Sequence, residues 1–222
     1  MRQLTFELNS PPSPTLDNFV VGRNAELLES LRQFLREDGT SRFIYIWGPE
    51  GVGKTHLIRA VGDVWNEKGN ILLKGVPAFE DIGLDDNICV TIDDIDRLDE
   101  NLQIYFFNLY NAIKESSARL VVSGKLPPSV LPLRADVNTR LSWGLVYQMH
   151  PLAESEKILA MKEYASSKGF KVPIEVISYV LAHYPRDMSS LLALLDGLDQ
   201  YSIEVKRKIT VPLVKDYVDM VS

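Results

Sequence analysis

Residues 42–57 read RFIYIWGPEGVGKTHL and join a strand pattern directly to a glycine-rich loop. The segment RFIYIWG is rich in β-branched and aromatic residues, which predicts a buried strand. Gly48–Thr55 matches the pattern G-x-x-x-x-G-K-[ST], and Leu57, Ile58 and Val61 then recur at helical spacing. A strand, a loop of this kind and a helix, in that order, predict a phosphate-binding site in an α/β domain.

The residue types in this loop suit phosphate chemistry. Glycines allow backbone N–H groups to approach phosphate oxygens, and a helix that begins at Lys54 directs the positive end of its dipole at them. Lys54 adds a cation at the terminal phosphates, and the Thr55 hydroxyl can bind Mg²⁺. A plain glycine-rich turn would require neither the strand before the loop nor the helix after it. The residues expected at the nucleotide are Gly48, Pro49, Glu50, Gly51, Val52, Gly53, Lys54, Thr55 and His56.

A second motif, CVTIDDID, supplies carboxylates. Its apolar residues predict a strand that delivers Asp93 and Asp94 to its carboxyl end, where α/β sheets place ligands. Asp93 is expected to bind Mg²⁺, and Asp94 to orient or deprotonate an attacking water. An acidic helix cap is the alternative interpretation, and it suits Asp96 or Asp99 better than Asp93.

Three further polar residues are candidates. Ser123 ends the strand pattern RLVVSG and could contact the terminal phosphate or the water, although an ordinary serine at a strand end fits nearly as well. Arg140, in NTRLSWG, carries no meaning by position alone. Arg186, in YPRDM, stands where a helix begins, and a cation there opposes the helix dipole, which indicates an anion nearby.

Strand and helix patterns alternate through the first 150 residues. Five strands are expected, at 42–48, 71–74, 88–93, 119–124 and 145–149, and they predict a mostly parallel sheet with helices on both faces. A helix between the third and fourth strands is expected to bury one face, composed of Leu102, Tyr105, Phe106, Leu109, Tyr110 and Ile113.

From Pro151 onward only helical patterns occur, and the first, from about Glu154 to Lys168, is expected to end at Gly169. We therefore expect three parts: an N-terminal peptide with a proline-rich tether at 1–17, a nucleotide-binding α/β domain at 18–150, and a small helical domain at 151–222.

Composition limits the function classes. The 222 residues carry a net charge of −6, and the only dense basic cluster is VKRK at 205–208, so we expect no strong direct DNA binding. The apolar runs are too short to cross a bilayer, and the first residues lack the pattern of a signal peptide. The single cysteine, Cys89, cannot form an intrachain disulfide and is expected to be a small buried hydrophobe. A cytoplasmic location is the default expectation.

The strings NFVVGRN, GPEGVGKTHL, TIDDID and TRLSWGL, with the helix at Arg186, together resemble the AAA+ ATPases, and among these the DnaA family of bacterial replication initiators. The resemblance extends from Asn18 to Val221. It implies an AAA+ P-loop domain followed by a helical lid, ADP or ATP with Mg²⁺ as cofactors, and contacts with other AAA+ subunits, including other copies of this chain. It also implies that Arg140 is an arginine finger acting in trans on a neighbour's γ-phosphate, and that Arg186 contacts the bound nucleotide from the lid. The adenine pocket would be bordered by Phe19, Val20, Val21 and Gly22.

The DNA-binding and N-terminal domains of DnaA have no counterpart in this sequence. The chain is therefore more similar to the DnaA-related regulators that inactivate DnaA after replication starts, with DnaA and the β sliding clamp as implied partners. Such regulators dock on the clamp through a short peptide, and QLTFEL at 3–8 has its form. The resemblance assigns the clamp contacts to Gln3, Leu4, Phe6 and Leu8.

Two departures from the family pattern bear on activity. Lys125 and Leu126, in GKLPP, stand where relatives carry an acid and an arginine, and the link at 75–87 is short for the helix that relatives place there. We expect weak ATP turnover by the chain alone, with stimulation of the ATPase of DnaA. An ATP-driven helicase loader or motor of the DnaA-like group is the alternative, and it predicts substantial turnover with a target. A P-loop kinase is a third hypothesis, but it does not explain Asp94 beside Asp93.

Overall fold

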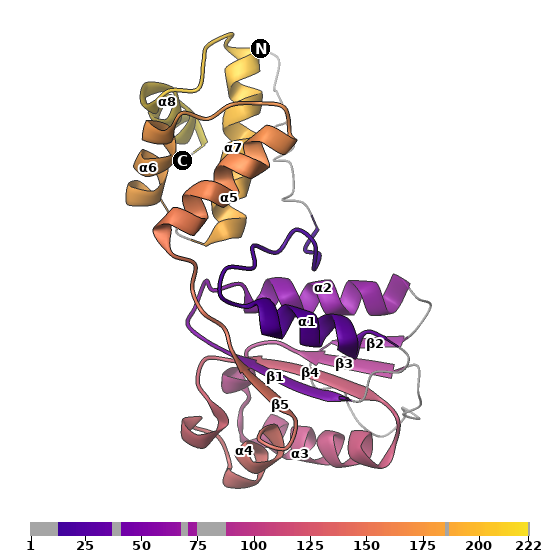
Figure 1. Cartoon of the computed structure of the whole chain (residues 1–222). Coiled ribbons are helices and arrows are strands. Elements are labelled where there is room, and N and C mark those ends of the chain that lie inside the picture. The colour runs from indigo at the N-terminus through magenta and orange to yellow at the C-terminus, as the bar shows by residue number, and fades with distance from the viewer. Residues whose placement is uncertain (1–12, 37–40, 68–70, 75–87, 185–186, 222) are drawn as a thin grey trace, which may run out of the picture. The chain divides into compact units, whose positions relative to one another are not determined.

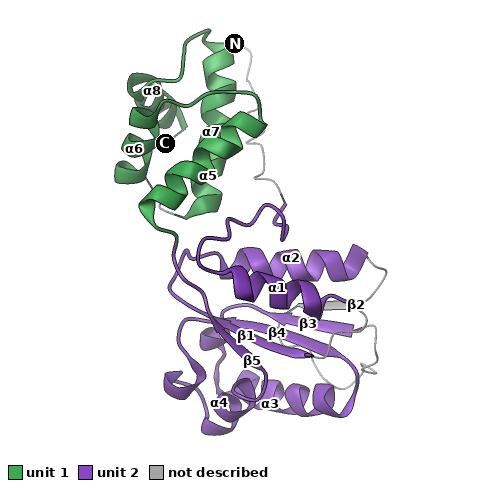
Figure 2. Ribbon diagram, viewed as in Figure 1, with its two compact units in different colours: residues 1–12, 152–222 green, residues 13–151 purple. Residues whose placement is uncertain are grey.

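The computed structural model describes residues 13–36, 41–67, 88–184 and 187–221, and the backbone of 71–74. The predicted clamp residues, the 75–87 link and Arg186 lie outside these ranges. Two compact units are present, one comprising Ser13–Pro151 and the other beginning at Leu152 (Figure 2).

The first unit is built on a five-stranded sheet (Figure 1). All four strand pairs are parallel and the order is β2-β3-β4-β1-β5, as expected for an α/β fold. Within the described residues, the 3₁₀ turns η2 and η3 occur in the connections. The elements are α1 (Ala25–Phe34), β1 (Phe43–Trp47), α2 (Lys54–Glu67), β2 (Ile71–Lys74), β3 (Ile88–Ile92), η2 (Ile95–Arg97), α3 (Glu100–Glu115), β4 (Arg119–Gly124), η3 (Pro128–Val130), α4 (Ala135–Leu141) and β5 (Leu145–Gln148).

Helices cover both faces of this sheet. Helices α1 and α2 lie on one face, and α3 and α4 on the other (Figure 1). Side chains of β1 alternate between the two cores: Ile44 and Ile46 pack with α1 and α2, whereas Tyr45 packs with α3 and α4. Because both faces are covered, the central strands are mostly apolar, which explains why the sequence signals them so clearly. Cys89 is buried in the core that includes α1 and α2, as expected, and burial raises the pKa of its thiol to about 12.

Strand order brings the chemical motifs together. Strands β3, β4 and β1 are neighbours, with Ile92 in register with Val122 and Trp47 with Gly124. Since all three strands run in one direction, the segments that follow them meet at the same edge of the sheet, which we call the carboxyl edge. The phosphate loop follows β1 and the acidic pair follows β3 at this edge.

The prediction for the buried face of α3 was wrong in its first two turns. Leu102 and Tyr105 are 36% and 49% exposed, and Gln103 is buried instead. The Gln103 amide is satisfied there, because its Nε2 donates to the Leu98 carbonyl at 2.9 Å and its Oε1 accepts from the Arg134 N–H at 2.9 Å. Helix α4 was also missed, since a helix of seven residues with two buried apolar positions gives no periodic signal.

Gly124 leaves room for the side chain of Tyr45. A Cβ at this position would lie 2.3 Å from the Tyr45 hydroxyl oxygen, which itself donates to the Leu126 carbonyl at 2.7 Å. We expect Gly124→Ala to lower the free energy of unfolding by about 1–3 kcal/mol, as for other overpacked cores. Urea titration measures this effect. In a double-mutant cycle, Tyr45→Phe should reduce the cost of Gly124→Ala, and strictly additive losses would contradict the assignment.

The second unit is a helical bundle with its own core. Its helices are α5 (Glu154–Ser167), α6 (Ile174–His183), α7 (Met188–Glu204) and α8 (Val211–Val221). Gly169, with φ of 87°, lies just beyond α5, as the sequence predicted for the end of this helix. Gly197 permits the approach of α8, because a Cβ there would lie 2.0 Å from the Tyr217 hydroxyl oxygen. Among the described residues, no helix of either unit has the length and apolar character needed to cross a membrane.

Candidate nucleotide site

The loop between β1 and α2 has the backbone expected of a phosphate cradle. Gly51 and Gly53 have φ values of 73° and 106°, which only glycine adopts without strain. A Cβ at Gly48 would lie 2.8 Å from the Met149 carbonyl oxygen, so no side chain fits there. Helix α2 begins at Lys54, and the first N–H groups of a helix have no acceptor within it. These features fit a polyphosphate bound over the start of α2.

Lys54 is held at the base of this loop. Its side chain is only 6% exposed, and the ammonium donates to the carbonyl oxygens of Gly48 and Pro49, at 2.9 Å each. Burial lowers the pKa of Lys54, while the nearby carboxylates of Asp94 and Asp93 act in the opposite direction. An ammonium carries three donors, so one remains for an anion beside the two carbonyls.

Asp93 connects the phosphate loop to the neighbouring strand. Its Oδ2 accepts from the Thr55 hydroxyl at 2.6 Å, and its Oδ1 accepts from the Ser123 hydroxyl. The predicted magnesium residues, Thr55 and Asp93, therefore lie together. In the described parts of the chain, no three His, Cys, Asp or Glu side chains are grouped as a metal site. A carboxylate and a hydroxyl suit Mg²⁺, which usually takes its other ligands from water and substrate phosphates.

Ser123 also positions Asp94. The Asp94 N–H donates to the Ser123 hydroxyl oxygen at 3.0 Å, and Asp94 adopts a left-handed conformation, with φ of 52°. Such conformations are costly for residues other than glycine and cluster at functional sites. The Asp94 carboxylate is paired with Arg97 at 3.2 Å, a partner that the sequence prediction did not include. The Ser123 hydroxyl therefore donates its hydrogen bond to Asp93 and accepts one from the Asp94 N–H, so it positions both acidic residues.

Lys125, one of the two residues after β4 that depart from the family pattern, contacts Asp96. The Lys125 N–H donates to Asp96 Oδ1 at 3.1 Å, and its ammonium lies 4.0 Å from Asp96 Oδ2. Asp96 therefore ties η2 to the segment after β4. Asp99 is the N-cap of α3, since its Oδ1 accepts from the Leu102 N–H at 2.8 Å. The capping alternative weighed for the acidic motif thus applies to Asp99.

The segment predicted to border an adenine pocket lies against the phosphate loop. The Phe19 ring is 5.5 Å from the His56 ring, and its nearest carbon lies 3.1 Å from the position that a Cβ on Gly53 would occupy. Gly22 has φ of 48°, where the chain turns toward α1. Both Val20 and Val21 are partly buried. Phe19 is therefore the member of this predicted group that is placed directly beside the loop.

Arg140 lies at the edge of the sheet where the parallel strands begin, opposite the carboxyl edge. It is near the end of α4, shortly before β5, and Leu145 of β5 is in register with Ile44. A Cβ at Gly144 would lie 2.5 Å from the Phe43 carbonyl oxygen, so this turn packs on the first residue of β1. The phosphate loop follows the far end of β1, about 13 Å away for a strand of this length.

The guanidinium of Arg140 is held by α3. Its Nε donates to Asn111 Oδ1 at 3.0 Å, and its Cζ lies 4.1 Å from the Trp143 ring centre and 4.9 Å from that of Phe107. Trp143 is 51% exposed, so this arrangement lies at the surface. Phe107 and Asn111 were absent from the sequence prediction, although their i, i+4 spacing places them on one face of α3.

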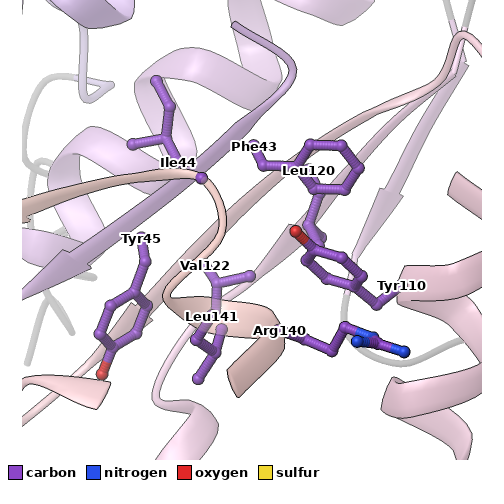
Figure 3. Close-up of a pocket in the computed structure, with 9 residues that line it drawn as sticks. Phe43, Ile44, Tyr45, Tyr110, Leu120, Val122, Arg140 and Leu141 are labelled. Atoms are coloured by element: carbon purple, nitrogen blue, oxygen red, sulfur yellow. The ribbon is translucent and has the colours of Figure 1, made fainter. Parts of the chain in front are cut away.

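A small void lies beside Arg140, between α3, α4 and the sheet (Figure 3). Its volume of about 10 Å³ suffices for one water at most, which excludes it as a nucleotide site. Tyr110 and the Arg140 side chain both line it, and burial raises the pKa of the Tyr110 phenol, which stays neutral beside the arginine. The void belongs to the packing that supports Arg140.

Comparisons with known proteins agree with this architecture. The family described as "Hda, lid domain" matches residues 154–218, and that described as "Bacterial DnaA ATPase domain" matches residues 11–72. Domain III of the Thermotoga maritima replication initiation protein DnaA is similar in structure, with a TM-score of 0.74 and 18% identity over 94% of this chain and 96% of that one.

Two further structures extend the comparison. AMPPCP-bound DnaA from Aquifex aeolicus has a TM-score of 0.67 at 20% identity, over 87% of this chain and 73% of that one. A single-residue variant of Thermotoga maritima RuvB has a TM-score of 0.67 at 17% identity, over 96% of this chain and 73% of that one. At these identities the likeness concerns the fold, and it confirms the predicted fold class, an α/β domain with a parallel sheet followed by a helical unit.

Proposed function

Because the chain belongs to the Hda/DnaA-like AAA+ proteins, we propose that it is a nucleotide-binding regulator of replication initiation that promotes hydrolysis of ATP bound to DnaA. In this proposal DnaA holds the ATP and performs the reaction, and this chain supplies Arg140 in trans. DnaA then carries ADP and is inactive, so the regulator exerts negative control of initiation.

The observation that carries this proposal is the placement of Arg140. The residue lies at the edge of the sheet opposite its own phosphate loop, so it serves a neighbouring subunit better than its own nucleotide. Asn111, Phe107 and Trp143 already hold the guanidinium, so little side-chain freedom would be lost on docking. A cation placed at the transferring phosphoryl group stabilises the charge of the transition state.

The chain's own site is proposed to bind ADP or ATP with Mg²⁺. Lys54 and the glycine-rich loop would hold the phosphates, and Thr55 and Asp93 would hold the cation, which neutralises phosphate charge when bound. The AMPPCP-bound DnaA structure offers a parallel for nucleotide in a protein of this fold. Arg186 lies outside the described residues, and its contact with the nucleotide from the lid remains part of the proposal.

We propose that intrinsic turnover is weak, and the contacts around Asp94 support this. The proposed base is paired with Arg97, and the hydroxyl proton of Ser123 is donated to Asp93. A base must be available to accept a proton from the attacking water, so these contacts oppose rapid hydrolysis. A helicase loader or motor would need Asp94 and Ser123 for ATP hydrolysis at its own site. The regulator and the loader therefore differ in which protein hydrolyses ATP, DnaA or this chain.

The peptide QLTFEL is proposed to dock this chain on the β sliding clamp. Replacing Gln3 and Leu4 together with alanine should lower clamp affinity at least tenfold, because buried anchors in an interface commonly contribute more than about 1 kcal/mol each. Surface plasmon resonance with immobilised clamp measures the change. Thr5→Ala is the matched control, since this residue lies between the predicted contacts, and equal affinity for all three chains would contradict the docking role.

A further inference from the structure

The last residues of the predicted N-terminal tether, before α1, form a closed turn. The Thr15 N–H donates to Asn18 Oδ1 at 2.8 Å, and the Asn18 N–H donates back to Thr15 Oγ1 at 3.0 Å. The Asn18 amide also donates to the Ser13 carbonyl at 3.0 Å. These reciprocal bonds fix the backbone from Ser13 to Asn18, directly before Phe19.

Two side chains fasten this turn to the body of the first unit. Leu16 is buried in the core shared by α1 and α2. His56, which follows Thr55 in the first turn of α2, contacts the Thr15 carbonyl oxygen through Nε2 at 2.8 Å. A carbonyl oxygen only accepts, so Nε2 carries the proton and donates it. A side chain of the phosphate-loop helix thus holds the segment that leads to Phe19.

The His56 ring itself stands between the turn and the loop. It is tilted by 55° against the Phe19 ring, whose edge lies against Gly53. Because Nε2 is already committed to the Thr15 carbonyl oxygen, the ring is suited to hold a wall of the site rather than to bind phosphate.

We propose that His56 is a positioning residue for the base side of the nucleotide site. It holds residues 15–19 against α2, so that the Phe19 ring forms an aromatic wall beside Gly53. An aromatic wall of this kind takes the planar base of a nucleotide by stacking. The inference rests on the proposed nucleotide binding and adds a residue that acts on the base through Thr15 and Phe19.

Calorimetric titration of the full chain with two probes tests the role. With Mg²⁺ present, ADP carries both base and phosphates, whereas tripolyphosphate carries phosphates alone. We expect His56→Ala to weaken ADP binding about tenfold, the effect of one lost hydrogen bond and its ordering, and to change tripolyphosphate affinity less than about twofold. His56→Gln, whose amide can also donate to the Thr15 carbonyl, should recover most of the ADP affinity.

A second variant keeps the inference testable if His56→Ala destabilises the fold. Asn18→Ala opens the same turn from an exposed position, and it should weaken ADP binding in the same selective manner. Phe19→Ala combined with His56→Ala should cost little more than Phe19→Ala alone, because both act on one wall. Equal losses for ADP and tripolyphosphate, or unchanged ADP affinity in the variants, would overturn the role of His56. Failure of the unmodified chain to bind ADP would instead remove the proposed nucleotide function, and this inference with it.

Discussion

Replacing Lys54 with methionine is expected to lower the affinity for ADP and ATP by about 10- to 100-fold, the value of one or two lost hydrogen bonds to a charged group. Lys54 is buried beneath the loop, and its ammonium is the cation placed among Gly48, Pro49 and the expected phosphates. Methionine keeps the volume of the side-chain stem and removes the charge. Titration calorimetry with each nucleotide measures the loss.

The matched control is Lys162→Met, on an exposed position of α5. It removes one positive charge and should leave nucleotide affinity unchanged, because Lys162 is not part of the phosphate loop. Circular dichroism should show that both variants remain folded. If Lys54→Met binds ADP as tightly as the unmodified chain, the loop does not bind phosphate in the manner proposed.

Arg140→Ala is expected to remove stimulation of DnaA-bound ATP hydrolysis by a factor of about 10³ or more, as for arginine fingers supplied in trans to GTPases. The reason is loss of the cation that would meet the γ-phosphate of the partner. ADP affinity of the chain itself should not change, because Arg140 lies at the opposite edge of the sheet from the phosphate loop. Single-turnover hydrolysis of ATP preloaded on DnaA measures the first effect.

Two controls separate a finger from a general surface charge. Arg134→Ala removes an arginine at the start of the same helix, one whose guanidinium is paired with Asp136 at 2.9 Å, and stimulation should persist. Arg140→Lys keeps the charge but loses the planar fork and its stacking on Trp143, so it should remain strongly impaired. Full stimulation by Arg140→Ala would exclude the finger, and loss of ADP binding in that variant would mark Arg140 as structural.

The sequence predicted those parts of the site that depend on local geometry. The phosphate loop needs glycines at fixed intervals between a strand and a helix, and these requirements are visible in 42–57 without knowledge of the fold. The same is true of Asp93, which must follow a buried strand, and of Gly169, which ends α5. The parallel sheet was predictable because its strands are buried on both faces and read as continuous apolar runs.

The parts that could not be predicted depend on residues far apart in the chain. Asn111 reaches Arg140 across 29 positions, and Ser123 reaches Asp93 across 30. In α3, Gln103 is buried and Leu102 is exposed, the reverse of what their polarity suggests. The buried Gln103 amide accepts a hydrogen bond from the Arg134 N–H, and no pattern within the helix reveals this partner. Such contacts become evident only after strand order has placed α3, α4 and β4 side by side.

The central claim is that this chain causes DnaA to consume its own ATP. The most direct measurement follows labelled ATP bound to DnaA after addition of this chain, ADP and clamp loaded on DNA. The account predicts rapid conversion of the DnaA-bound ATP to ADP when all components are present, with little hydrolysis by this chain alone. Unchanged DnaA-bound ATP, together with fast ATP turnover by this chain, would contradict the claim and support an ATP-driven loader or motor.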